Sequence, residues 1–115
     1  MTPTERQDLI DSIKERTQFV VTEQDFERFI VMLEEDYGIT SAMDFEDKFS
    51  GEFEGYGEHI TAQFCEDMVE ECGYLVNVPD FLMGCIDWQL VWYSALRHDY
   101  IDIQWQENTY IFRRF

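Results

Sequence analysis

Positive charge is scarce in this sequence. It has 8 Lys and Arg against 25 Asp and Glu, and its formal net charge at pH 7 is −17. From residue 34 to residue 96, one base, Lys48, stands among fifteen acids. Because phosphate contacts are made by Lys and Arg, this balance argues against DNA, RNA or an anionic membrane as a partner. It favours basic proteins instead, including proteins built to hold nucleic acid.

Histidine and cysteine are also few. His59 and His98 are the only histidines, and no Ser or Cys nucleophile motif accompanies them, so we expect no enzymatic activity. Six and twelve residues separate Cys65, Cys72 and Cys85, whereas zinc sites need closely spaced ligand pairs. No stretch fits a calcium-binding EF-hand loop either. We therefore expect no metal and no cofactor, although calcium buffering is a further alternative for so acidic a chain.

Long apolar runs are missing as well. No segment has the length of a membrane span or the pattern of a secretion signal. Together with the odd number of cysteines, this predicts a cytoplasmic protein with reduced thiols.

Apolar and aromatic residues are nevertheless plentiful, at 45% and 17% of the chain. Acidic disordered segments are poor in aromatics, so this composition predicts a folded core inside an acidic surface. The length of 115 residues suits one domain. We expect an N-terminal helical segment over residues 1–40 and an acidic domain over residues 41–115, or one continuous domain.

Helical patterns occupy most of the chain. "TPTERQDLIDSIKER" predicts a first helix, and Thr22 caps a second, which ends at Gly38 and buries Phe26, Phe29, Ile30 and Leu33. Ser41 precedes a short third helix, "AMDFEDKF". In "EHITAQFCEDMVEECG", helical spacing predicts a buried stripe of Ala62, Cys65, Met68, Val69 and Cys72.

The remaining segments are shorter. We interpret "QFVV" as a strand or a loop, "SGEFEGYGEH" as a turn, and "VPDFLMG" as a turn or short helical piece. "IDWQLVWYSALRH" predicts a helix apolar nearly all round, either deeply buried or shared with a partner. "YIDIQW" and "TYIFRRF" alternate with the period of a strand and predict a hairpin joined by "QEN". The fold class is therefore α+β, mostly helical with a small antiparallel sheet or hairpin at the C-terminus.

The acids follow a pattern that folding does not require. Glu66 and Glu70 are four residues apart on the expected fourth helix, as are Asp67 and Glu71, and like charges at that spacing destabilise a helix. Such carboxylates recur about every 6 Å, broadly as phosphates do along DNA. Ordinary surfaces mix both signs of charge. We therefore predict an elongated anionic surface of phosphate-mimicking carboxylates: Asp44, Glu46, Asp47, Glu52, Glu54, Glu58, Glu66, Asp67, Glu70 and Glu71.

Several short motifs also occur in a characteristic order over roughly residues 44–114. They comprise Phe45, Asp47, Phe49, Gly51, Glu52 and Phe53; then Val78, Pro79 and Leu82; then Ile86, Asp87 and Trp88; and lastly Ile111, Phe112 and Arg113. This order resembles the C-terminal part of the ArdA-type antirestriction proteins. The resemblance implies a DNA mimic from a phage or mobile element. Members of that family are elongated acidic homodimers that occupy the DNA-binding groove of type I restriction–modification enzymes.

The chain also departs from that family. Gln89 stands where the family has Glu, and Trp92, Tyr93 and Ser94 stand where acids usually follow. A second expectation is therefore an inhibitor of another DNA-handling complex, such as a CRISPR effector, and a third is an acidic adaptor for a basic protein segment. Taken residue by residue, Trp88, Trp92 and Tyr93 are core candidates, but as one band they predict a contact within a homodimer.

Overall fold

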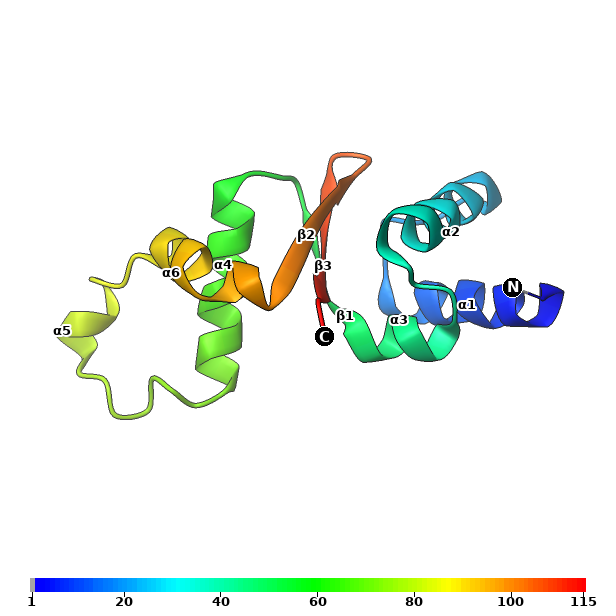
Figure 1. Ribbon diagram of the computed structural model, residues 1–115. Coiled ribbons are helices and arrows are strands. Elements are labelled where there is room, and N and C mark those ends of the chain that lie inside the picture. The colour runs from blue at the N-terminus through cyan, green and yellow to red at the C-terminus, as the bar shows by residue number, and fades with distance from the viewer. Residues whose placement is uncertain (1) are drawn as a thin grey trace. The chain divides into compact units, whose positions relative to one another are not determined.

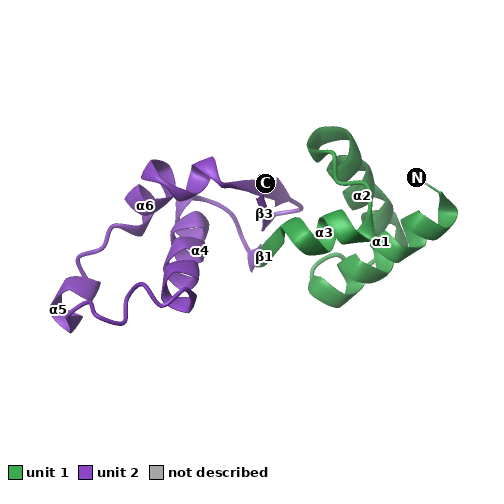
Figure 2. Cartoon of the chain, turned by 60° about the horizontal axis from the view of Figure 1, so that its bottom comes forward, with its two compact units in different colours: residues 1–52 green, residues 53–115 purple. Residues whose placement is uncertain are grey.

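The computed structural model describes residues 2–115 and confirms the α+β class. Most of the secondary structure is helical, and the strands form one small three-stranded antiparallel sheet (Figure 1). The chain forms two compact units (Figure 2). Unit 1 runs to Glu52, and unit 2 runs from Phe53 to Phe115. The sequence suggested a division after residue 40. The structure has the division further along the chain, because the third helix packs against the first.

Unit 1 contains three helices, α1 (Pro3–Arg16), α2 (Glu23–Tyr37) and α3 (Ala42–Lys48). Each begins at a hydroxyl side chain that accepts a hydrogen bond from the backbone N–H three residues on. The caps are Thr2, Thr22 and Ser41, at 3.1, 3.0 and 3.1 Å. These bonds satisfy amides that a helix cannot pair internally. The three predicted helices are confirmed.

The core of unit 1 lies where α1 packs against α2 and α3. α2 buries Phe26, Phe29, Ile30 and Leu33, the predicted stripe. It ends at Gly38, whose φ of 67° is left-handed and favours glycine. Between α1 and α2 the chain forms a loop, not a strand, in which Val20 is buried and Val21 is exposed.

Strand β1 (Phe49–Glu54) spans the boundary between the two units. The sequence predicted a turn in "SGEFEGYGEH", and for residues 50–54 that prediction is wrong. Phe49, Gly51 and Phe53 do alternate with Ser50 and Glu52, but glycine and glutamate weaken the local strand signal. The strand belongs to a sheet of order β1-β3-β2, so its pairing comes from residues far away in the sequence.

Strands β2 (Tyr100–Trp105) and β3 (Asn108–Arg113) form the predicted hairpin, with Ile103 opposite Tyr110. The connection is only Gln106 and Glu107, whose φ values are 48° and 67°. Two successive left-handed residues are the geometry of a two-residue turn that follows the strand twist. Asn108, expected in the connection, is the first residue of β3.

Unit 2 also contains α4 (Glu58–Glu71), α5 (Asp80–Met83), α6 (Trp88–Ser94) and a 3-10 helix (Leu96–His98). Its core joins Phe64 and Cys65 of α4 to Trp92 of α6 and Ile111 of β3. The Phe64 ring makes edge contacts with Phe53, Trp92 and Tyr100, at centroid distances of 6.2, 6.2 and 5.1 Å. This ring cluster therefore ties α4 and α6 to the sheet.

The end of α4 differs from the predicted stripe. The buried residues of α4 are Ile60, Thr61, Phe64 and Cys65, so full burial is confined to the first half of the helix. In the predicted stripe, Ala62, Met68 and Val69 are half-buried, and Met68 packs against the core. Cys72, predicted to face the core, is exposed, because the last turn of α4 extends past the residues that cover it. The helix closes as predicted at Gly73, whose φ is 78°.

α6 is shorter and more exposed than its composition predicts. Trp92 is its one buried residue, while Leu90 and Tyr93 are exposed. The alternative of a deeply buried helix is therefore wrong. Within residues 2–115, no helix combines the length and apolar character needed to cross a bilayer.

Candidate partner-binding surface

The negative charge is shared almost equally between the two units. Unit 1 contains fourteen acids and five bases, a net charge of −9, and unit 2 contains eleven acids and three bases, a net charge of −8. The excess of acid that sequence position placed in the middle of the chain is thus a property of each folded unit. Each must keep its fold against its own repulsion.

The densest group of predicted site residues lies on α4. Glu70 and Glu71 are exposed and Glu66 and Asp67 are half-exposed, whereas the opposite face of the helix enters the core. Asp67 accepts a hydrogen bond of 2.8 Å from the Gln63 amide. Within residues 2–115, no hydrogen bond or ion pair engages the carboxylates of Glu66, Glu70 and Glu71. These acids are presented to solvent in a row.

The same acids oppose the dipole of their helix. Glu70 and Glu71 lie in the last turn of α4, which has no base. The carbonyl end of a helix carries partial negative charge, so each acid there costs about 0.3–1 kcal/mol. α2 repeats the arrangement: its last turn also has no base and carries the exposed Glu34, Glu35 and Asp36. The site prediction omitted these three residues, although their run of like charge at a helix end was visible in the sequence.

Glu46, on α3, is engaged within unit 1. Its carboxylate accepts a 2.6 Å hydrogen bond from the Ser12 hydroxyl of α1 and lies 3.9 Å from the Arg16 guanidinium. Its side chain remains 44% exposed. Glu46 therefore joins α3 to α1, with a part of its surface still open to solvent.

Glu52 has an even closer structural role. One oxygen of its carboxylate accepts the backbone N–H of Gln18 at 2.7 Å, and the other accepts that of Phe19 at 3.1 Å. These amides belong to the loop after α1, which has no secondary structure to pair them. Glu52 thus satisfies a loop that would otherwise leave two donors unpaired. Both carboxylate oxygens of Glu52 therefore stabilise the fold of unit 1.

The other acids before α4 vary in exposure. Asp44 is half-buried in the first turn of α3, where negative charge suits the helix dipole, and Asp47 is exposed on the same helix. Glu54 is exposed at the end of β1. Of these three, Asp47 and Glu54 are thus the more exposed.

Glu58 opens α4 and meets Tyr93 of α6. The Tyr93 hydroxyl donates a 3.2 Å hydrogen bond to Glu58, and this bond raises the pKa of the phenol. Arg97 lies 6.0 Å from the centroid of the same ring. Tyr93 therefore has partners within its own unit while still exposing about half of its surface.

Trp92 does not fit the predicted dimer contact. It is 7% exposed and packs against Phe64, so its indole is part of the core of unit 2. Trp88 is half-buried against the same cluster. Of the three aromatic residues assigned to a dimer contact, Tyr93 is the one that is exposed, at 49%.

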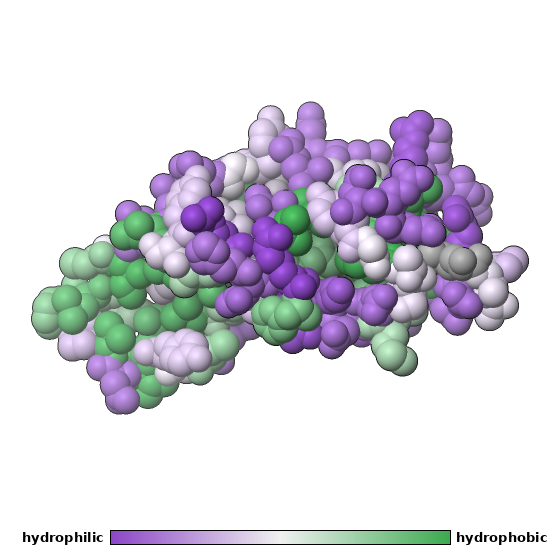
Figure 3. Space-filling view, in the orientation of Figure 1, coloured by the Kyte–Doolittle hydropathy of each residue, from purple (hydrophilic) through white to green (hydrophobic). Residues whose placement is uncertain are grey.

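A larger apolar surface lies nearby. No residue from 66 to 91 is buried, although this segment is rich in apolar side chains. The most exposed large ones are Val76 at 80%, Phe81 at 76%, Tyr74 at 74% and Leu90 at 59%. Figure 3 shows apolar surface gathered where α5 lies. Exposed surface of this kind is typical of a site that meets another molecule.

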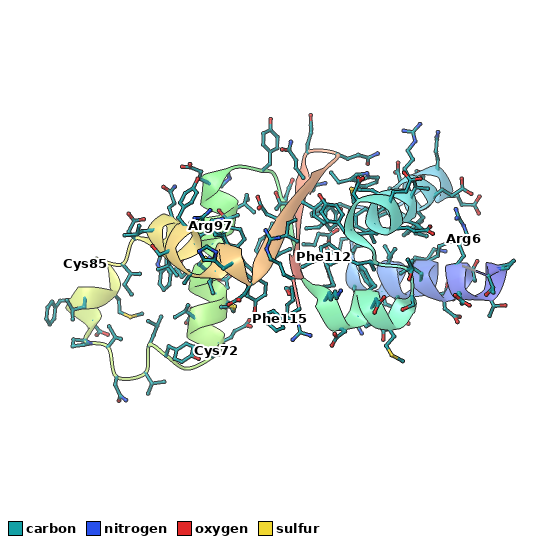
Figure 4. The ribbon with its side chains drawn as sticks, viewed as in Figure 1. Arg6, Cys72, Cys85, Arg97, Phe112 and Phe115 are labelled. Carbon is teal, nitrogen blue, oxygen red and sulfur yellow. The ribbon has the colours of Figure 1, made fainter. Side chains whose placement is uncertain are left out.

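Within the described residues, no group of three or more His, Cys, Asp or Glu side chains is arranged to hold a metal ion. Burial raises the pKa of the Cys65 thiol to about 11, which keeps it protonated and unreactive at neutral pH. Cys72 and Cys85 are exposed at the two ends of the segment that carries α5 (Figure 4).

No protein-family model, curated protein or solved structure matches this chain.

Proposed function

We propose that the protein is a DNA mimic that inhibits a DNA-binding defence enzyme in the cytoplasm of a bacterial host. The leading target is a type I restriction–modification enzyme, because the motifs of residues 44–114 resemble ArdA-type proteins. The carboxylates would occupy a groove lined by Lys and Arg in place of DNA phosphates. No covalent chemistry is involved, and the inhibitor acts by competition.

The observation that carries the proposal is the row of acids on α4. Glu66, Glu70 and Glu71 have no partner among the described residues, and the last two oppose the helix dipole. A surface selected for stability alone would place bases there. Acids that destabilise their own helix and face solvent are explained if their attraction to a basic partner offsets the lost helix stability.

Cluster substitution tests this role. The variant E66Q/D67N/E70Q/E71Q should weaken binding to an immobilised type I complex by at least tenfold, because many contacts contribute together. The control D11N/E15Q/E23Q/E27Q also removes four negative charges, but from exposed positions in α1 and α2. It should weaken binding far less. Equal effects of the two variants would mean that net charge, and not the α4 row, accounts for binding.

One observation favours the acidic adaptor as a second candidate. Glu5, Asp8 and Glu46 line a single pocket of 380 Å³ in unit 1. An adaptor would collect carboxylates around such a pocket to hold a basic segment, whereas a mimic spreads them along a face. Binding of a Lys-rich peptide that is lost in E5Q/D8N but retained in the α4 variant would favour the adaptor.

We also propose that the protein forms a homodimer through the exposed apolar segment. Taking about 200 Å² for an aromatic and about 100 Å² for an aliphatic side chain, the exposed parts of six residues offer roughly 600 Å². They are Tyr74, Val76, Phe81, Leu82, Leu90 and Tyr93. A stable interface buries about 800 Å² on each partner, so a second copy of the chain could cover most of this surface.

The oligomeric state tests the homodimer. Light scattering should give the mass of two chains for the natural protein and of one chain for F81S/L90S, two exposed positions whose change leaves the core intact. The control V21S changes an exposed apolar residue of unit 1, and this variant should remain dimeric. A monomeric mass for the natural protein would contradict the proposal.

A further inference from the structure

The few bases of unit 2 are not scattered. Arg97, Arg113 and Arg114 are its only Lys or Arg residues, and all lie in the last nineteen positions. Two of them, Arg97 and Arg114, line one cavity of 490 Å³ together with His98, and Trp92 and Asp102 complete its wall. A unit with a net charge of −8 thus contains a hollow where positive charge predominates.

Backbone carbonyls hold both guanidinium groups in place. The Arg97 Nε donates to the Tyr93 carbonyl at 2.6 Å, which fixes the side chain against α6 (Figure 4). The Arg114 Nε donates to the carbonyls of Arg97 and Tyr100, at 3.1 and 3.0 Å. Each arginine therefore uses its inner nitrogen for the fold, which leaves the two outer nitrogens for another acceptor.

Those outer nitrogens are not neutralised by the chain. In the part of the chain that the structure describes, neither Arg97 nor Arg114 forms an ion pair, although eleven acids belong to the same unit. Asp102 lines the cavity but lies beyond ion-pair distance of both. Two guanidinium groups without an ion-pair partner are unexpected on a surface so rich in carboxylates.

We propose that this cavity is an oxyanion site that takes a phosphate group. A guanidinium group matches two oxygens of one anion, and two guanidinium groups and an imidazole that line the same cavity supply several donors. A tetrahedral phosphate dianion can use all of these donors, whereas a single carboxylate is satisfied by one fork. The group can come from inorganic phosphate or from a phosphomonoester, since both present the same oxygens.

A titration with the natural protein tests the site. Inorganic phosphate should cause saturable shifts of the His98 ring and Arg97 side-chain resonances in NMR spectra, and glycerol 2-phosphate should do so if a monoester also fits. Ionic strength is held constant with sodium chloride, because any salt screens the repulsion within a chain of net charge −17.

Three variants decide the outcome. R97Q should weaken phosphate binding by tenfold or more, and R97K, which keeps the charge but loses the fork, should also weaken it. R28Q removes one arginine from the exposed face of α2 and should change the affinity less than twofold. The site is refuted if chloride gives the same shifts, or if R97K and R28Q both bind phosphate as the natural protein does.

Discussion

At the scale of the residue, the acids of this protein have different roles despite their identical chemistry. Glu52 holds two backbone amides of a loop, and Glu46 joins two helices. Glu66 and Glu70 make no such contact in the described chain. The predicted set of ten phosphate surrogates therefore contains acids that build the fold as well as acids that face solvent.

Replacement of Glu52 measures this difference. Glu52→Gln keeps one acceptor oxygen but loses the charge and the second hydrogen bond. The free energy of unfolding, measured with urea, should therefore fall by about 1–3 kcal/mol. Glu54→Gln, two residues further along the same strand and exposed, is the control and should change stability by less than about 0.5 kcal/mol. Similar losses in the two variants would contradict the structural role of Glu52.

The cysteines give a second test. The pKa of Cys65 is raised by burial from 9.0 to about 11, so its contribution to stability is complete below pH 9 and is lost as the pH rises towards 11. At pH 8, a maleimide should label the exposed Cys72 and Cys85 quickly and Cys65 only after unfolding. Equal labelling rates for all three thiols in the folded protein would show that Cys65 is not buried.

At the scale of the element, local signals determined most helices. Thr22, Gly38 and the apolar stripe of α2 lie within one short segment, and each agrees with the others. β1 was missed because its strand conformation depends on β3, more than fifty residues away. Cys72 was misplaced because helical spacing predicts which face is apolar but not how far along the helix the core extends.

The last turn of α4 tests whether stability was given up for binding. E70Q/E71Q removes two acids from the carbonyl end of the helix and should stabilise the protein by about 0.3–1 kcal/mol per acid at low salt. Glu23→Gln, in the first turn of α2, should have the opposite sign. Chemical denaturation measures both changes. A destabilised E70Q/E71Q variant would mean that these acids support the fold.

At the scale of the whole molecule, composition predicts a class of partner, but it does not predict which acids are free to meet one. The net charge of −17 already argued against nucleic acid. It did not show that Glu46 and Glu52 are engaged, because Ser12, Gln18 and Phe19 are more than thirty residues away from them. Trp92 was likewise ambiguous until its contact with Phe64 placed it in the core.

Salt dependence follows from the same charge. If carboxylates replace phosphates in a basic groove, binding to the target should weaken steeply as the salt concentration rises, since exposed charges are screened. The affinity of the target complex should therefore fall with salt for the natural protein and fall less for E66Q/D67N/E70Q/E71Q.

Displacement of DNA tests the central claim most directly. A fluorescent duplex carrying the recognition site is bound to a type I restriction–modification enzyme, and the protein is titrated in while anisotropy is followed. We predict complete, saturable release of the duplex, with the E66Q/D67N/E70Q/E71Q variant at least tenfold less effective than the natural protein. A ternary complex, in which the protein binds the enzyme while the duplex stays bound, would contradict DNA mimicry.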